Sequence, residues 1–438
     1  MLRTPSLRIL TWLVLTCAPA ASPAAIIGHM TPPPPLSEAR IATLPPAQQA
    51  PWQAYLAHSR ALAAADRAAL ALERKDGPAP ADPPEQRHSG ADMPLKRPAA
   101  WYASPDARHV ADVIVSFQTP AGGWGKNMAR SGALRQRGQN WVATGDSYVG
   151  TIDNDATTTE LRFLARVQAQ VPGTAGASYR AAFLKGIRYL LDAQYPNGGF
   201  PQVYPLAGGY HDAITFNDDA LLEVAEVLDA AARRDQEYGF VPPAVAAQAR
   251  AAAGKVLQLI LSTQVVVHGV RTVWGQQVDM LTLAPVGARN FEPVSLVSAE
   301  SAALLEFLMM QPAPSPEVVA AVHAGAGWLR RAALRDIEWT EGSSDAAPEA
   351  GRRRVDRPGA GPVWARYYEI DDGEIDAAHG STRPIFGDRD RSIHDDVNEL
   401  SPERRNGYAW YGTRPAAPLA AYAGWSRRHP LPASTVPH

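Results

Sequence analysis

The sequence has a single cysteine, Cys17, among its 438 residues. We expect Cys17 to lie in an N-terminal segment that is removed on export, so the mature chain should contain no thiol. Its absence excludes a disulfide framework, a cysteine-ligated metal and a cysteine nucleophile. The stability of the fold must then come from core packing, and a chain of this length can bury a large core.

A surplus of charge is also missing, because 42 Lys and Arg residues face 44 Asp and Glu residues. This balance gives no general attraction to nucleic acid or to an anionic membrane surface, and no nucleic-acid partner is expected. An acidic ligand would have to be held by a local group of cations. No apolar run is long enough for a transmembrane span. The chain is expected to act as a monomer.

Residues 1–25 have the pattern of an export signal. Arg3 and Arg8 supply the positive start, residues 9–15 a short apolar run, and residues 18–25 small side chains suited to a signal peptidase. A secreted or periplasmic location is therefore predicted. A buried N-terminal helix is one alternative. A lipid anchor at Cys17 is a weaker one, because a threonine precedes this cysteine.

The rest of the sequence divides into two parts. Residues 26–98 are rich in Ala and Pro, and we interpret them as a linker with one helix near residues 50–75, which could pack on the main domain. Residues 99–438 form the main domain, where apolar residues recur with helical spacing and few segments alternate with period two. The helices predicted there cover residues 104–118, 157–170, 178–193, 218–234, 243–263 and 296–310.

A weak repeat follows three of these helices. In each copy a glutamine ends a helix, a turn with Pro or Gly follows, and an aromatic residue comes next: Gln118 to Trp124, Gln194 to Phe200, and Gln264 to Trp274. Gly and Pro are common where helices end. Three unrelated turns would be the simpler interpretation, but repeated units of this size favour stacked helical pairs that curve into a toroid.

Two acidic clusters stand immediately before predicted helices. The first contains Asp153, Asn154 and Asp155, and the second contains Asn217, Asp218 and Asp219. One such residue would suffice to cap a helix. Because carboxylate and amide oxygens are also the ligands that calcium prefers, two such clusters facing each other predict a cation site between them.

Arginines alternate with aromatic residues in the last third of the chain. Arg289 lies in a loop before a predicted helix, and further arginines stand in residues 364–368, 383–390 and 404–411 beside Trp, Tyr and Phe. Some of these arginines could simply pair with nearby aspartates. Together with oxygen ligands for a cation, however, guanidinium groups and aromatic faces suit a sugar that carries a carboxylate, a uronate.

With these clusters in place, the sequence resembles the family-10 polysaccharide lyases, which are bacterial pectate lyases. The resemblance spans about residues 101–412 and depends on several motifs occurring in one order. The motifs are Gly122-Gly-Trp-Gly-Lys-Asn127, Thr151-Ile-Asp-Asn-Asp-Ala-Thr157, Ala193-Gln-Tyr-Pro-Asn-Gly-Gly-Phe-Pro-Gln202, Ile214-Thr-Phe-Asn-Asp-Asp-Ala220, Ala288-Arg289 with Glu292, Trp364-Ala-Arg-Tyr-Tyr368 and Asn406-Gly-Tyr-Ala-Trp-Tyr-Gly412.

The resemblance implies an all-α fold, an (α/α)3 toroid with short strands in the connecting loops, which cleaves polygalacturonate by calcium-dependent anti-β-elimination. It implies Arg289 as the base and Asp153 as a calcium ligand, with Asp218 or Asp219 as the second ligand and Asp218 preferred. The residues implied to bind substrate are Lys126, Asn154, Thr158, Trp274, Arg366 and Arg389. Two departures stand out: residues 371–382 look inserted between Arg366 and Arg389, and Asn290 and Phe291 replace the usual neighbours of the base.

An arginine base needs a lowered pKa, because a free guanidinium stays protonated far above neutral pH. We expect nearby positive charge and burial to lower the pKa of Arg289. Other functions remain open from the residues alone. Asp153 and Asp218 could serve as the acid and base of a helical-barrel glycoside hydrolase. The chain could also bind uronans without cleaving them, and the aromatic turns are also found in toroidal terpenoid cyclases, although the many arginines argue against that.

Overall fold

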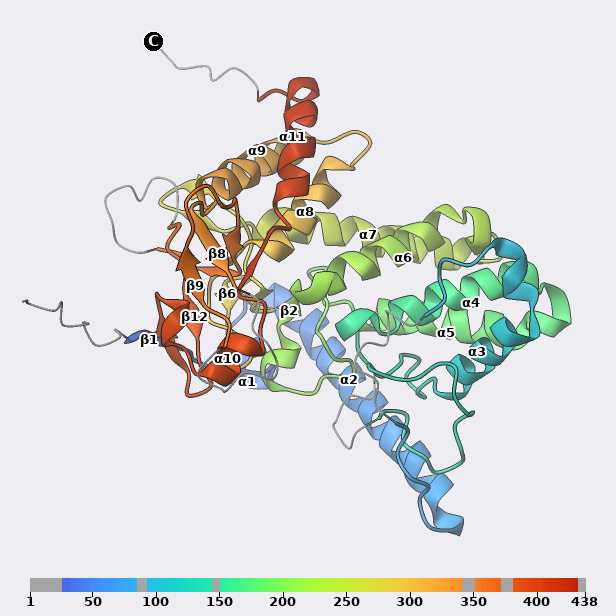
Figure 1. Cartoon of the computed structure of the whole chain (residues 1–438). Coiled ribbons are helices and arrows are strands. Elements are labelled where there is room, and N and C mark those ends of the chain that lie inside the picture. The colour runs from blue at the N-terminus through green and yellow to red at the C-terminus, as the bar shows by residue number, and fades with distance from the viewer. Residues whose placement is uncertain (1–25, 85–92, 144–149, 341–350, 372–380, 432–438) are drawn as a thin grey trace, which may run out of the picture.

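The computed structural model describes residues 26–84, 93–143, 150–340, 351–371 and 381–431. The predicted export signal with Cys17 and most of the predicted insertion at residues 371–382 lie outside these ranges. The described chain is mainly helical, with short strands gathered at one side (Figure 1). The helices are α1 (Glu38–Ile41), α2 (Pro46–Glu73), α3 (Pro105–Ser116), α4 (Thr158–Gln170), α5 (Ala177–Ala193), α6 (Ala220–Arg233), α7 (Pro243–Thr263), α8 (Ala299–Met309), α9 (Pro316–Arg331), α10 (Pro402–Asn406) and α11 (Ala416–Arg428).

The strands are two to four residues long, and all their pairings are antiparallel. They form two three-stranded sheets, β1-β13-β12 and β2-β5-β6, and four pairs, β3-β4, β7-β11, β8-β9 and β10-β14. Their bounds are β1 (Ile26–His29), β2 (Ile214–Thr215), β3 (Val266–Val267), β4 (Val270–Arg271), β5 (Gln277–Val278), β6 (Pro285–Val286), β7 (Leu296–Val297), β8 (Ile337–Trp339), β9 (Arg354–Asp356), β10 (Trp364–Ala365), β11 (Tyr367–Tyr368), β12 (Phe386–Gly387), β13 (Ser392–His394) and β14 (Tyr411–Gly412).

Three helical hairpins form the body of the molecule. Helix α4 packs on α5, α6 on α7 and α8 on α9, while α3, α5, α7 and α9 follow one another as neighbours in a single row. Helices α6 and α7 lie side by side along most of their length (Figure 1). The predicted all-α (α/α)3 fold with short strands in the connecting loops is confirmed, and each of the six predicted helices of the main domain is present.

The glutamine repeat has a structural basis. Each glutamine donates its side-chain amide to a carbonyl of its own turn and to a carbonyl of the next helix in the row. For Gln118 the acceptors are Gly122 and Ala182 at 2.8 and 2.8 Å. The corresponding acceptors are Gly198 and Ala252 for Gln194, and Thr272 and Ala321 for Gln264. The three turns are therefore one unit used three times, and each ties successive hairpins together.

Tryptophans anchor the same turns. The indole N–H of Trp124 donates to the Ile114 carbonyl at 2.7 Å, and that of Trp274 donates to the Ile260 carbonyl at 2.7 Å. Both side chains are fully buried. Because a buried indole needs a partner for its N–H, these bonds fix the rings against the last turn of the preceding helix.

The N-terminal segment packs on the rest of the protein through β1, α1 and the first half of α2. Strand β1 extends the β12-β13 pair, and helix α2 runs diagonally from the middle of the molecule down to its lower edge, where its far end projects (Figure 1). Trp52 and Tyr55 of α2 pack against Tyr195, with ring centroids 5.1 and 4.7 Å apart. The segment interpreted as a linker with a helix thus contributes to the hydrophobic core.

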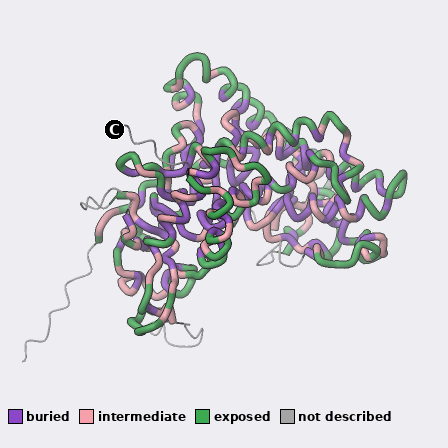
Figure 2. The backbone as a smooth tube through the Cα atoms, turned by 90° about the horizontal axis from the view of Figure 1, so that it is seen from above, coloured by how far each residue is buried: buried purple, intermediate pink, exposed green. Residues whose placement is uncertain are grey.

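Buried residues run through the interior of the helical body and of the strand-rich side, and exposed residues cover the outer loops (Figure 2). One hydrophobic cluster extends from Leu36 to Trp425. Among the described residues, no helix has the length and apolarity needed to cross a membrane. The turn before α4 contacts the turn before α6, which itself contacts α8, so two of the polar clusters singled out in the sequence come together there.

Candidate functional site

The two acidic clusters form the same turn. The hydroxyl of Thr151 accepts from the Asp153 amide at 3.0 Å, and the hydroxyl of Thr215 accepts from the Asn217 amide at 3.2 Å. Each turn is a single 3-10 turn directly before α4 or α6, and the two turns contact each other. The clusters expected to face one another are thus neighbours in the fold.

The backbone of both turns enters the left-handed region at matching positions. The φ angle is 51° at Asn154 and 50° at Asp218, and it is 60° at Asp155 and 61° at Asp219. Asn and Asp tolerate this conformation better than other residues with a Cβ. Position by position, Asp153 corresponds to Asn217 and Asn154 to Asp218, so each turn presents one carboxylate and one amide at its first two positions.

These turns open into a polar cavity of about 110 Å³. Its walls come from the α4 and α6 turns, the β2-β5 region and the loop before β7. The lining residues are Lys126, Asp153, Asn154, Gln202, Tyr210, Asn217, Asp218, Gln276, Gln277, Ala288, Arg289 and Glu292. Five of the candidate residues therefore share one cavity, although they are far apart in the sequence.

The two carboxylates of the cavity differ in their surroundings. Asp153 is 5% exposed and forms an ion pair with Lys126, whose Nζ atom lies 2.5 Å from a carboxylate oxygen. Asp218 accepts from the side-chain amide of Asn217 at 2.7 Å and lies 4.0 Å from a guanidinium nitrogen of Arg366. Burial raises the pKa of Asp218 and the charge of Asp153 raises it further, while Arg366 lowers it. The two carboxylates repel each other, and cations partly balance them.

Arg289 is held by Glu292. Its Nε and Nη2 atoms donate to the two carboxylate oxygens of Glu292 at 2.9 and 2.6 Å, and its backbone amide donates at 2.9 Å. Burial works to lower the pKa of Arg289, but the hydrogen bonds and charge of Glu292 outweigh it and the pKa is raised. The lowered pKa that we expected from neighbouring positive charge is absent in this arrangement, because the nearest charged partner is an anion.

Glu292 is also tied to the protein behind it. Its carboxylate is 2% exposed and accepts from Tyr408 at 2.7 Å in addition to Arg289. Burial would raise its pKa, but Arg289 and Tyr408 lower it to about 2. A buried carboxylate with this many donors contributes to the stability of the folded chain as long as it is charged.

We expect Glu292→Gln to lower the free energy of unfolding by about 1–3 kcal/mol at neutral pH. Because the folded pKa of about 2 lies below the ordinary value of 4.5, this contribution is complete above pH 4.5 and is lost as the pH falls towards 2. Urea unfolding of both proteins between pH 7 and 2 measures it. The difference between them should shrink through that window, whereas Glu338→Gln, at a half-exposed glutamate paired with an exposed arginine, should cost little at any pH. A constant difference would contradict the assigned charge.

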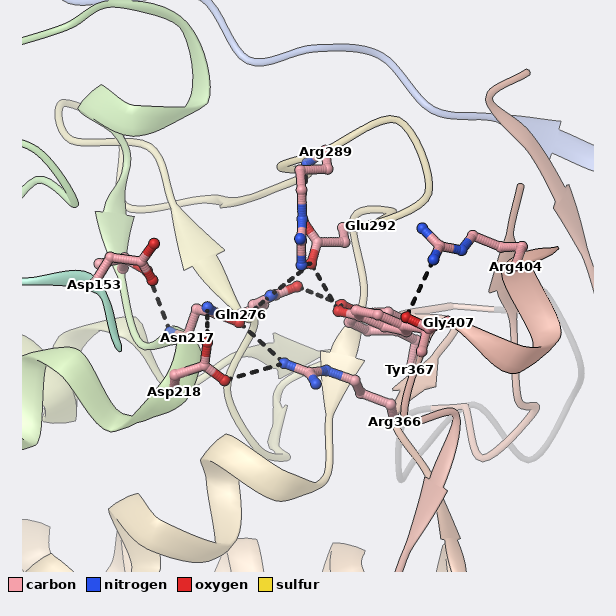
Figure 3. A network of polar contacts seen from close by, with 12 residues as sticks. Asp153, Asn217, Asp218, Gln276, Arg289, Glu292, Arg366, Tyr367, Arg404 and Gly407 are labelled. Carbon is pink, nitrogen blue, oxygen red and sulfur yellow. Dashed lines mark hydrogen bonds and ion pairs between the residues drawn. The ribbon is translucent and has the colours of Figure 1, made fainter. Parts of the chain in front are cut away.

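A continuous network joins Arg289 to Arg366 behind the cavity (Figure 3). The Tyr408 hydroxyl lies 2.6 Å from the Tyr367 hydroxyl, and Tyr367 donates to the side-chain oxygen Oε1 of Gln276 at 2.6 Å. Gln276 donates in turn to the side-chain oxygen of Asn217 at 2.5 Å. These hydrogen bonds fix the rear wall of the cavity.

Arg366 closes this network at the other end. It donates to Asn217 at 3.0 Å and to the buried carboxylate of Glu300 at 2.7 Å, and its side chain is 14% exposed. The guanidinium therefore lies at the base of the site, oriented by Glu300 in the first turn of α8. Glu300 and Gln276 were not predicted as site residues, and Asn217 was named only as a member of the second acidic cluster.

The remaining candidates lie apart from the cavity lining. Asp219 is paired with Arg414. Arg389 pairs with Glu403 and is 63% exposed. Thr158 is fully buried, with its hydroxyl on the Asp155 carbonyl at 3.1 Å. Trp274, expected to contact substrate, lies instead in the core, because its indole anchors the glutamine turn. Neither buried side chain can reach a ligand in this arrangement.

Within the described ranges, no group of three or more His, Cys, Asp or Glu side chains is arranged to hold a metal ion. Asp153 and Asp218 supply two carboxylates to the cavity, and Asn154 and Gln202 add amide oxygens. Such a donor set is incomplete for a calcium ion, which takes six to eight oxygens. It suits a cation whose remaining ligands come from water and from a bound anion.

Comparisons with known proteins identify the family of this chain. The family model described as pectic acid lyase matches residues 118–418. Two solved structures of a family 10 polysaccharide lyase from Cellvibrio cellulosa are 32% identical with TM-scores of 0.62. One, an alanine variant in complex with trigalacturonic acid, covers 77% of this chain and 98% of its own, and the other covers 78% and 97%. A comparison with curated protein sequences found no match.

Proposed function

Because this chain belongs to the pectic acid lyases of polysaccharide lyase family 10 and is a pectate lyase, we propose that its polar cavity cleaves polygalacturonate by calcium-dependent anti-β-elimination. The observation that carries the proposal is the convergence of Asp153, Asp218 and Arg289 on one cavity. Trigalacturonic acid is the ligand of the similar Cellvibrio enzyme. We infer that the same class of acidic sugar occupies this cavity.

The proposed calcium ligands are Asp153 and Asp218, one from each of the paired turns. Their repulsion favours a cation between them, since the charge of Asp153 raises the pKa of Asp218. The galacturonate carboxylate would complete the incomplete set of oxygens. If the substrate supplies some of the calcium ligands, the protein side chains alone need not provide a complete set.

In the proposed reaction, Arg289 removes the C5 proton, which is α to the uronate carboxylate, and the electron pair of that bond forms the C4=C5 double bond. The bond from C4 to its oxygen breaks, and the departing oxygen takes up a proton from solvent. Calcium bound to that carboxylate would stabilise the negative charge that develops there. Arg366, held by Glu300 and Asn217, adds a fixed positive charge at the base of the site. Lys126 and Asn154 are proposed to contact substrate from the opposite wall, and Arg389 from the rim.

Arg289 must give up its ion pair with Glu292 to act as a base, because that pair holds the guanidinium in its charged form. Activity that rises with pH is the expected consequence. The pattern of residues 1–25 further supports the proposal that the enzyme is exported, where it would meet polymeric pectate.

Chelation tests the proposed function directly. We expect purified enzyme to release unsaturated uronides from polygalacturonate in calcium at alkaline pH, and EDTA to abolish the release until calcium is restored. Ultraviolet absorbance of the conjugated product measures this reaction. A glycoside hydrolase would produce new reducing ends without the absorbance. Undiminished absorbance in EDTA would overturn the calcium requirement, and reducing ends alone would overturn the elimination.

A further inference from the structure

We propose that residues 26–82, the N-terminal brace, position the active site by holding two of its loops, the one that carries Arg289 and the one that begins at Lys126. The brace lies outside residues 118–418, which match the family model. The inference rests on the proposed function for the roles of Arg289 and Lys126. The brace contacts the rest of the protein at its first end, in its middle and at its other end, and these contacts support the proposal.

The first end of the brace supports the Arg289 loop. Strand β1 pairs with β13, and the Met30 amide donates to the Arg391 carbonyl at 2.8 Å. Met30 is 5% exposed and packs against Gly287, where a Cβ would come within 3.3 Å of its side chain. Because Gly287 is two residues before Arg289, the Met30 side chain fixes the backbone from which the base projects.

The middle of the brace is bonded to the loops below the cavity. The Leu36 amide donates to Asp212 at 3.0 Å, and Arg40 pairs with Asp279 at 2.5 Å. On α2, the Tyr55 hydroxyl donates to the Ala193 carbonyl at 2.9 Å, and Ser59 accepts from the Leu206 amide at 2.9 Å. These anchors fix the course of α2 across the body of the molecule.

The other end of the brace holds the loop that begins at Lys126. Glu73, the last residue of α2, accepts from Arg135 at 2.6 Å and from the Gly138 amide at 2.7 Å. Arg135 in turn lies over the Trp141 ring, 4.3 Å from its centroid. The loop then returns on itself at its base, since a Cβ on Gly125 would come within 2.5 Å of Val142. The position of Lys126 therefore depends on this anchor.

The C-terminal half of α2 makes little other contribution. Its buried side chains end at Asp66, and no apolar residue after Leu56 is buried. Among the described residues, Leu62 packs at the edge of the core, and polar contacts tie the rest to the body, to the loop at residues 135–140 and from Asp66 to the Ala121 amide at 2.9 Å. The C-terminal half of α2 therefore extends past the residues that α2 buries in the core and ends on a loop next to the cavity. We interpret this half as an element that positions the loop.

The second end is tested with Glu73→Ala in the full chain. We expect the KM for oligogalacturonate to rise about fivefold with kcat nearly unchanged, because Lys126 is released while Arg289 is not. The control is Glu38→Ala, which removes an exposed carboxylate paired with Arg60 inside the brace. It should leave both constants unchanged. Restoration of KM by the double reversal Glu73→Arg with Arg135→Glu would support the assigned pair.

The first end is tested with Met30→Ala, which should lower kcat about fivefold with KM unchanged, because the base loop loses its support. Ile26→Ala is the control, since Ile26 is 54% exposed on β1, four residues before Met30. Thermal unfolding separates positioning from stability. If the changes in kcat and KM of either brace variant disappear once the rates are normalised to the folded fraction at the assay temperature, or if neither constant changes, the brace only stabilises the fold or does nothing, and the inference is wrong.

Hydrogen–deuterium exchange gives a result that does not depend on activity. Glu73→Ala should speed exchange of the amides at residues 125–128 and 135–142 and leave the rest of the protein as it was. Equal protection in Glu73→Ala and the parent protein would overturn the inference even if the enzyme proved inactive. Failure of the proposed function would appear instead as absence of product from the parent protein.

Discussion

Arg289→Ala should reduce kcat on polygalacturonate by about 10²- to 10⁴-fold, the usual contribution of a general base. Substrate binding should change little, because Asp153, Asp218 and Arg366 remain in place. The prediction is measured by initial rates from product absorbance and by calorimetric titration with trigalacturonate in calcium. A large loss of turnover with retained affinity is the signature of a group that acts only in the transition state.

The controls address charge and shape separately. Arg289→Lys keeps a cation but not the fork that bonds to Glu292, so it should not restore activity. Arg233→Ala removes an exposed arginine at the far end of α6, paired with Asp229, and should leave kcat unchanged. Product release by Arg289→Ala at a rate near that of the parent enzyme would exclude this residue as the base.

Asp218→Asn should lower activity on the order of 10²-fold at fixed calcium, and should raise the calcium concentration needed for half-maximal activity by about tenfold or more. The asparagine keeps the shape and the bond from Asn217 but loses the charge that a cation requires. Lyase rates across a series of calcium buffers measure both effects, and Asp229→Asn on the exposed side of α6 is the control.

Asp219→Asn provides the decisive contrast. Its carboxylate is paired with Arg414 and does not line the cavity. We expect only a modest loss of activity and an unchanged calcium dependence, with some loss of stability from the broken pair. A calcium requirement that shifts in Asp219→Asn and not in Asp218→Asn would reverse the assignment of the second ligand.

Most of the helical body could be predicted from the sequence, because its helices carry long apolar periods between Gly and Pro turns. Helix α7 was predicted with its observed bounds. Helices α9 and α11 were not predicted. Gly325 and Gly327 lie within α9, and Pro418 stands in the first turn of α11, and all three residues weaken the helical signal. Packing on α8 compensates for that weakness in the fold.

The composition of the cavity was predicted better than its arrangement. Asp153, Asp218 and Arg289 stand in local patterns that a linear sequence displays. Arg289's pairing with Glu292 reverses the expected direction of its pKa shift, and only side-chain geometry reveals that. Trp274 shows a second limit of sequence analysis. An aromatic residue that follows a turn gives the same sequence pattern whether its ring faces a sugar or packs in the core.

The paired turns before α4 and α6 have one further consequence. They are related by an internal symmetry in which amide and carboxylate have exchanged places, Asp153 with Asn154 and Asn217 with Asp218. The exchange changes the partners of the two positions. The side-chain oxygen of Asn217 accepts hydrogen bonds from Gln276 and Arg366, whereas the carboxylate of Asp153 pairs with Lys126. A symmetric backbone thus carries an asymmetric charge pattern, and a sugar chain, whose two ends differ, meets a different partner on each side of the proposed cation.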